Sequence, residues 1–212
     1  MNLAELRREY TKGGLRRADL DPLPLVQFQK WFEEALNSQL LEPSAMTLAT
    51  ADAEGRPSAR IVLLKGADER GFLFFTNYEG RKGHELAANP RASLVFYWAE
   101  LERQICIAGD VTKVSRTESE KYFALRPRGS QLGACVSKQS SAVADRAFLE
   151  ARLQEVEKQF ANREVEMPAQ WGGYVLAPMR IEFWQGRPNR LHDRFQYSKQ
   201  ADGAWRIDRL SP

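Results

Sequence analysis

The chain has 212 residues, of which 43% are hydrophobic and 28% charged, and its formal net charge is +3. This composition is typical of a folded globular protein and excludes a low-complexity or collagen-like chain. Such a small net charge does not by itself indicate nucleic-acid binding. The N-terminus has no apolar signal segment, and no run approaches the ~18 apolar residues of a membrane span. A cytoplasmic protein that contacts neither membrane nor nucleic acid is expected.

Several familiar chemistries are excluded by their missing motifs. The sequence has no GxGxxG after a strand, no GxxxxGK[ST], no HExxH and no GxSxG. Cys106 and Cys135 are too few for a disulfide framework and are expected to be reduced thiols. With only two histidines besides, no metal-ligand spacing is present, so no metal site is expected.

The first twenty residues are charged and contain Gly13 and Gly14, which predicts a mobile N-terminal segment over 1–20 and a single domain over 21–212. Apolar residues at three- and four-residue steps then predict a helix over 25–36. Strands are predicted at 45–50, 58–65, 71–77, 92–98, 103–114, 174–178, 180–185, 193–199 and 204–210. Helices are predicted at 80–90, 116–127 and 145–160, the last with Phe148, Leu149, Leu153, Val156 and Phe160 on its apolar side. The pattern indicates an α+β fold, an antiparallel barrel-like sheet with helices packed outside.

Two basic clusters lie at the ends of predicted strands. Arg60 and Lys65 are expected on opposite faces of one regular strand, which equally suits a core strand with charged ends. Arg81 and Lys82 open a predicted helix, where cations oppose the helix dipole. An anion site would explain that conflict, and a solvated basic turn is the alternative.

The stretch from Tyr122 to Ser141 is the richest in polar groups. Tyr122 and Arg126 share a helix face, and Ser130 is expected just beyond, in a loop with Gly129. A phenol, a guanidinium and a hydroxyl can together bind a phosphate, although a polar loop needs no ligand. Two such sets on separate segments suit two phosphorylated ligands, and also RNA, so charge does not decide between them.

The ordered stretches LRREYTKGGLRR, RIVLLK, FFTNYEGRK, LERQ, KYFALRPRGSQLGACVSKQSS, WGGY, IEFWQG, RLHDRF and WRIDRLSP resemble the pyridoxine (pyridoxamine) 5′-phosphate oxidases over nearly the whole chain. The resemblance implies an FMN-binding split β-barrel with Greek-key-like antiparallel strands. It implies a homodimer with FMN at the subunit interface. It also implies oxidation of pyridoxine or pyridoxamine 5′-phosphate by dioxygen to pyridoxal 5′-phosphate, with release of peroxide. A hydride would pass from substrate C4′ to flavin N5.

The resemblance also implies a role for individual positions. For FMN it points to Arg60, Ile61, Val62, Leu63, Leu64, Lys65, Phe75, Thr76, Arg81, Lys82, Gln104, Gln139, Ser140, Trp184 and Arg194. For the substrate it points to Arg7, Arg8, Glu9, Tyr10, Lys65, Tyr122, Arg126, Ser130, Arg190, Leu191 and His192. Arg190 and His192 are the expected catalytic residues: Arg190 orients the pyridine ring, and His192, with an ordinary pKa of about 6.5, helps manage a proton. A purely structural His192 is the alternative.

Three positions carry smaller hypotheses. Phe75 departs from many relatives, which have tyrosine; a lost phenol contact would weaken FMN binding by about 0.5–1.5 kcal/mol. Arg16 and Arg17 are either a second anion site for regulation by product or a solvated basic tail. His84 is expected to be structural or exposed. The rival functions are a flavin- or haem-binding split barrel without this activity, which would lack the substrate set, and a nucleic-acid-binding module.

Overall fold

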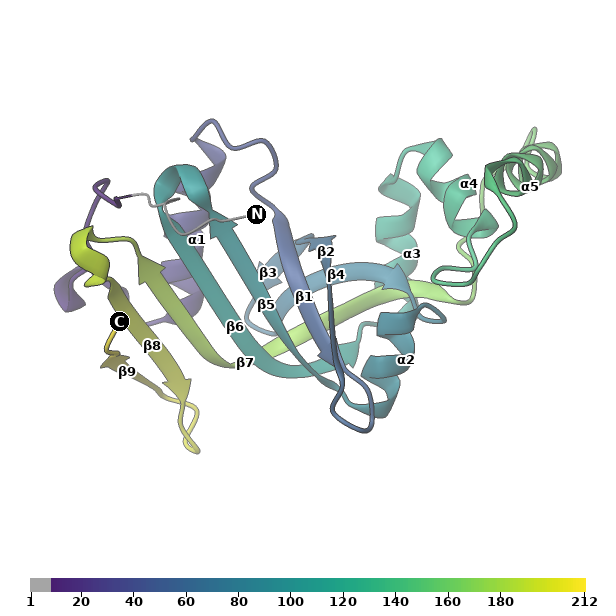
Figure 1. Ribbon diagram of the computed structural model, residues 1–212. Coiled ribbons are helices and arrows are strands. Elements are labelled where there is room, and N and C mark those ends of the chain that lie inside the picture. The colour runs from purple at the N-terminus through teal and green to yellow at the C-terminus, as the bar shows by residue number, and fades with distance from the viewer. Residues whose placement is uncertain (1–8) are drawn as a thin grey trace.

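The computed structural model describes residues 9–212 as one antiparallel sheet with five helices (Figure 1). The helices are α1 (Pro24–Leu36), α2 (Arg81–Ala88), α3 (Arg116–Leu125), α4 (Arg128–Val136) and α5 (Arg146–Gln159). The strands are β1 (Ala45–Ala51), β2 (Pro57–Leu63), β3 (Gly66–Asp68), β4 (Gly71–Asn77), β5 (Arg91–Trp98), β6 (Arg103–Lys113), β7 (Trp171–Gln185), β8 (Asp193–Lys199) and β9 (Trp205–Arg209). The α+β class and the split-barrel architecture expected from the sequence are confirmed.

The long strand β7 connects two parts of the sheet. The strand order is β2-β1-β5-β6-β7-β4-β3, and β8 also pairs with β7 and carries β9. The first half of β7 pairs with β4 and its second half with β8. In Figure 1, β8 and β9 therefore lie at one end of the sheet, while α3, α4 and α5 project from the other.

The main core fills the curved side of the sheet, under α1. Pro24 at the first turn of α1 suits a helix start, and its apolar face then inserts aromatic rings into the sheet. The ring of Phe28 lies 4.9 Å from that of Phe72, and Trp31 lies 5.2 Å from Phe183. Burial of each such side chain stabilises the folded state by about 1.5–3 kcal/mol. α1 therefore closes one side of the barrel.

A smaller second core holds the projecting helices to the start of β7. It contains Phe123, Leu132, Val156, Phe160, Val165, Met167 and Trp171. Side-chain caps set the helix starts, since Ser115 accepts from the Glu118 N–H and Asp145 from the Phe148 N–H. This second core fixes α3 and α4 beside β4, where the candidate site forms.

Four sequence predictions of local structure were wrong. Ser130 lies in the helix α4, because burial of Leu132 outweighs the loop signal of the neighbouring glycine. The two predicted strands 174–178 and 180–185 are one strand, since Pro178 falls at the register shift opposite Gly109, where a sheet tolerates proline.

The predicted strand 58–65 ends at Leu63, and Lys65 instead bonds through its N–H to the Leu73 carbonyl. On α5, Phe148 is 49% exposed, whereas Val156 and Phe160 are buried. The helix packs on α4 by its C-terminal half, so its first turn lies free of the core. Within residues 9–212, the structure contains no helix with the length and apolar character needed to span a membrane.

Candidate active site

A cavity of about 720 Å³ opens between β2, β4 and the helices α3 and α4. Its walls are Ile61, Val62, Leu63, Lys65, Phe75, Thr76, Asn77, Lys82, Tyr122, Leu125, Arg126, Pro127, Ser130, Gly133, Ala134, Ser137, Gln139 and Trp171. Eight predicted FMN positions and all four residues predicted for the substrate phosphate are on this wall. We call these lining residues, with the neighbouring Arg60, Arg81, Glu85 and Ser140, the pocket group.

The floor of the cavity holds a buried cation. The ammonium of Lys82 donates to Gln139 Oε1 at 2.6 Å and to Thr76 Oγ1 at 3.2 Å. Burial and the nearby charge of Arg60 lower the pKa of Lys82. An anion placed here would relieve both effects, because a negative charge favours the protonated amine.

The first turn of α2 carries the next cation. The Arg81 N–H donates to the Ser140 hydroxyl at 3.3 Å, and Ser140 has a left-handed φ of 70°. Gly80 caps the helix, and a Cβ there would lie 2.5 Å from Gln139 Oε1, so any larger residue would displace the Gln139 side chain. The segment of Gln139 and Ser140 is therefore held against the helix N-terminus, where backbone N–H groups favour anions.

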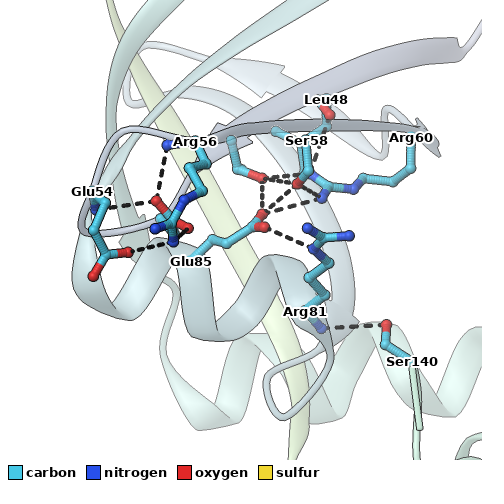
Figure 2. Close-up of polar contacts among 10 residues, drawn as sticks. Leu48, Glu54, Arg56, Ser58, Arg60, Arg81, Glu85 and Ser140 are labelled. Carbon is cyan, nitrogen blue, oxygen red and sulfur yellow. Dashed lines mark hydrogen bonds and ion pairs between the residues drawn. The ribbon is translucent and has the colours of Figure 1, made fainter. Parts of the chain in front are cut away.

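A network of polar groups holds the Arg60 side chain (Figure 2), which does not itself line the cavity. Its guanidinium bonds to the hydroxyls of Thr50 and Ser58 and forms a 3.1 Å ion pair with Glu85. Leu64, predicted as an FMN contact, is buried in the main core with 8% exposure.

Three parallel aromatic rings form another wall. Phe75 stacks on Tyr122 with ring centres 4.0 Å apart, and Trp171 lies 5.4 Å from Phe75. The Arg126 guanidinium lies 4.8 Å from the Trp171 ring centre. Its Nη1 is buried without a hydrogen-bond partner in the described part of the chain, and burial lowers the Arg126 pKa. A buried guanidinium nitrogen without an acceptor calls for a partner, and an anionic ligand would supply one.

A second set of predicted residues lies at the other end of the sheet, and we call it the sheet-end group. It consists of Tyr10, Gln104, Trp184, Arg190, His192 and Arg194. Gln104, Trp184 and Arg194 are directly opposite one another on β6, β7 and β8. His192 lies 4.7 Å from Trp184 and 5.7 Å from Tyr10 between ring centres.

Two side chains of the sheet-end group, those of Arg194 and His192, already have polar partners. Arg194 contacts both carboxylate oxygens of Glu182, at 2.7 and 3.0 Å. His192 Nδ1 accepts the Arg187 N–H at 3.1 Å, so a neutral imidazole carries its proton on Nε2. Arg190 is exposed and has a left-handed φ of 61°, as does Asn189 at 56°. Leu191 is 70% exposed, so the loop that contains Asn189, Arg190 and Leu191 is open to solvent.

The two groups do not meet within one chain. β2 is four strand spacings from β7 in the sheet, about 19 Å. β4 is the neighbour of β7 but pairs with it only at Trp171–Leu176, so Trp184 lies at least about 26 Å further along the strand. An arginine side chain does not span that separation. The structure thus assembles the predicted FMN and substrate positions as two partial sites.

The N-terminal residues extend the sheet-end group. Arg7 and Arg8 lie outside the described residues, Glu9 is exposed, and the Tyr10 ring lies 5.5 Å from Trp184. Glu102 Oε2 accepts the N–H groups of Thr11 and Lys12 at 2.8 and 2.9 Å. Arg16 pairs with Asp19, and regulation by product at Arg16 and Arg17 stays a prediction. His84 is exposed, which is one of the two alternatives expected from the sequence.

Sequence reasoning missed two residues of the pocket group with clear polar or aromatic roles. Trp171 lies within the WGGY stretch, but its place beside Arg126 depends on the fold of α3. Glu85 follows Arg81 by four residues, so the helical spacing could have indicated their ion pair.

Comparison with known proteins agrees with this geometry. A family model described as pyridoxamine 5′-phosphate oxidase matches residues 32–160, and one described as pyridoxine 5′-phosphate oxidase C-terminal dimerisation region matches 171–212. The chain belongs to the pyridoxine/pyridoxamine 5′-phosphate oxidase family. Proteins named pyridoxine/pyridoxamine 5′-phosphate oxidase from Paraburkholderia phymatum and a Nostoc species are 59% and 57% identical, covering 99% of this chain and 99% and 98% of theirs.

Solved structures extend the comparison. PhzG from Burkholderia lata, in complex with tetrahydrophenazine-1-carboxylic acid, has a TM-score of 0.87 at 31% identity, over 92% of this chain and 95% of that one. An FMN-binding protein from Nostoc punctiforme, related to pyridoxamine 5′-phosphate oxidase, has a TM-score of 0.70 at 18% identity, covering 87% and 97%, and shows the shared fold. The chain is thus similar both to proteins named pyridoxine/pyridoxamine 5′-phosphate oxidase and to PhzG, and an oxidoreductase of this family is supported.

Proposed function

We propose that the protein oxidises pyridoxine 5′-phosphate and pyridoxamine 5′-phosphate to pyridoxal 5′-phosphate with dioxygen, using FMN. Peroxide is released, and with the amine substrate water supplies the aldehyde oxygen and ammonia leaves. The observation that carries the proposal is the cavity with two cationic sets from separate segments. Lys82 and Arg81 lie at the α2 end, and Arg126 lies at the aromatic wall. Two phosphates, one from the cofactor and one from the substrate, would match these sets, since each carries roughly −1.5 to −2 charges at pH 7.

The residues present fit an FMN phosphate at the α2 end. Lys82 is a buried cation, Arg81 leads the helix, and Ser140 presents a hydroxyl beside it. Apolar Ile61 and Val62 and the edge of the cavity would contact the flavin ring. When bound, FMN supplies the redox chemistry by accepting a hydride from substrate C4′ and passing the electrons to dioxygen, which leaves as peroxide.

The substrate phosphate would lie near Lys65, Tyr122, Arg126 and Ser130. The unpartnered Arg126 Nη1 then gains an acceptor, and Tyr122 and Ser130 line the same wall. These groups would hold the substrate at its phosphate end, which leaves its ring free to meet the flavin. Positioning of this kind contributes to catalysis because it fixes reacting atoms before the chemical step.

A homodimer would complete the site. Because the sheet-end group is separated from the cavity of its own chain by strand order and by position along β7, its Arg190 and His192 would serve the cavity of a second copy. The described dimerisation region, residues 171–212, contains every member of the sheet-end group except Tyr10 and Gln104. In this arrangement Arg190 orients the substrate ring, and His192 Nε2 donates a hydrogen bond to the substrate oxygen or nitrogen at C4′.

The sheet face between the two groups suits that partner. A shallow groove of about 540 Å³ runs across β1, β5 and β6 and is lined largely by small side chains, including Ala49, Ser93 and Ala108. Small residues let another backbone approach closely. We propose that a second copy of this chain covers the face and brings its Trp184 and Arg194 to the flavin.

The test is an absorbance spectrum of the purified protein, followed by anaerobic addition of pyridoxine 5′-phosphate. A flavin spectrum that bleaches and returns on admitting air is expected. Tetrahydrophenazine-1-carboxylic acid, the compound in the PhzG structure, is the matched alternative substrate. If only that compound bleaches the flavin, the proposed substrate is wrong and the proposed cofactor is right. A protein that stays colourless and inactive with added FMN would contradict both the substrate and the cofactor.

A further inference from the structure

Glu85 is a buried carboxylate beneath the cofactor end of the cavity, with an exposure of 6%. It accepts hydrogen bonds from Thr50 Oγ1 at 2.5 Å, from Ser58 Oγ at 2.6 Å and from Arg60 at 3.1 Å, all on one oxygen. Its other oxygen accepts from Arg81 Nε at 3.1 Å. Figure 2 shows Glu85 between the two arginines, one from β2 and one from α2.

This arrangement sets the relative position of two cationic side chains. Glu85 accepts a hydrogen bond only from Nε of Arg81. The two terminal nitrogens of Arg81 have no acceptor among the described residues. The Arg81 side chain is 71% exposed, so without Glu85 it would sample many rotamers. The ion pair therefore holds Arg81 with its free edge available to an anion.

Local helix energetics do not explain why the pair is there. A cation in the first turn opposes the helix dipole, and an arginine four residues before a glutamate is the weaker of the two orientations. The helix α2 has no acidic residue in its first turn. A local arrangement that disfavours the helix points to a function, because consistent local choices are the rule elsewhere.

We propose that Glu85 is a positioning residue that fixes Arg81 for the phosphate of the flavin cofactor, while Arg60 holds Glu85 in place. The inference rests on the proposed function, since it assigns a role at the same FMN site. The opposing effect is repulsion between the Glu85 carboxylate and the phosphate. Positioning outweighs it, because the ion pairs with Arg60 and Arg81 offset the charge of this carboxylate, and Arg81 precedes Lys82 of the cavity floor.

The experiment compares FMN with riboflavin, which lacks only the phosphate. Dissociation constants of both are measured by flavin fluorescence for wild type, Glu85→Ala and Glu85→Gln. In Glu85→Ala the FMN constant is expected to rise about tenfold or more, and the riboflavin constant to change less than about twofold. Glu85→Gln, which retains shape but only part of the hydrogen bonding, is expected to lose about threefold for FMN.

The matched control is Glu150→Ala, which removes a carboxylate from the i,i+4 pair with Arg146 on α5, far from the cavity. Its two constants are expected to stay at wild-type values. Equal weakening of both flavins in Glu85→Ala, or tighter FMN binding, overturns the inference. If Glu85→Ala does not fold, Glu85→Gln decides, and an unchanged FMN constant in that variant overturns it. If the wild-type protein binds neither flavin, the proposed function itself is contradicted.

Discussion

The pocket group and the sheet-end group differ in how their charges are satisfied. In the pocket group, Arg126 keeps a buried nitrogen without an acceptor, and burial lowers the pKa of Lys82. In the sheet-end group, Arg194 is fully engaged with Glu182, and His192 is fixed through Nδ1. The comparison suggests that the pocket group supplies anion affinity, whereas the sheet-end group supplies shape and a directed donor. Variants of the two groups should therefore differ in how strongly they change ligand affinity and how strongly they change the rate of the reaction.

The largest effect is expected from Arg126→Met. The variant removes the cation that the cavity leaves unpaired, and losing one partner of a buried charge pair costs about 2–5 kcal/mol. We expect kcat/KM for pyridoxine 5′-phosphate to fall about 10²–10³-fold, mostly through KM, with FMN binding retained. Arg152→Met on the exposed side of α5 is the control. Wild-type kcat/KM in Arg126→Met would remove the substrate phosphate from this wall.

The second effect tests the sheet-end group. Arg190→Lys keeps the charge but loses the planar fork, so a residue that orients a ring should lose about 10–100-fold in kcat/KM. The FMN constant should remain within about twofold, because the anion affinity belongs to the pocket group. A near-normal kcat/KM would remove Arg190 from the mechanism. Mixing this variant with Arg126→Met should restore part of the activity, since a heterodimer would contain one site with both wild-type residues.

Local patterns in the sequence were sufficient for most of the fold. The predicted positions of α1, α2, β4 and β6 are confirmed within a few residues, because each has a clear apolar period and a bounding turn. α4 was missed because Gly129 and Gly133 weaken its helical signal, while the burial of Leu132 that forms it is a tertiary effect. β7 was divided in two because no local pattern shows that Pro178 falls at a register shift.

The site was predictable as a set of residues and not as a place. Motif order identified Arg126 and Lys82, and both line the cavity. The separation of Trp184 from that cavity follows from the strand order and from the register of β4 on β7, which a single sequence does not specify. Likewise, Glu85 joins side chains from β1, β2 and α2, and only its pairing with Arg81 has a local spacing.

The third prediction contrasts stability with binding in the pocket group. Burial lowers the pKa of Lys82, so the charged amine is held at a cost in the absence of an anion. Lys82→Met retains the length of the side chain and removes that charge. We expect FMN affinity to fall about tenfold, while the melting temperature of the flavin-free protein stays equal or rises. A lower melting temperature together with unchanged FMN affinity would show that Lys82 is structural.

The smallest effect concerns acid stability and Glu85. Burial alone would raise the pKa of this carboxyl, but hydrogen bonds from Ser58, Thr50 and Arg60 outweigh burial and lower it to about 2. A folded-state pKa below the unfolded value of about 4.3 stabilises the protein above that unfolded value. This contribution is then lost as the pH falls toward 2.

Urea unfolding of flavin-free wild type and Glu85→Gln between pH 7 and pH 2.5 measures this contribution. Because glutamine retains part of the hydrogen bonding, we expect wild type to be more stable at pH 7 by on the order of 1 kcal/mol, and the difference to shrink below about pH 4. A constant difference across the range would mean that the ionised carboxylate does not stabilise the network. Arg60 would then be held by Thr50 and Ser58 alone, and the pocket group would owe its preorganised cations to hydroxyl contacts and not to the buried charge.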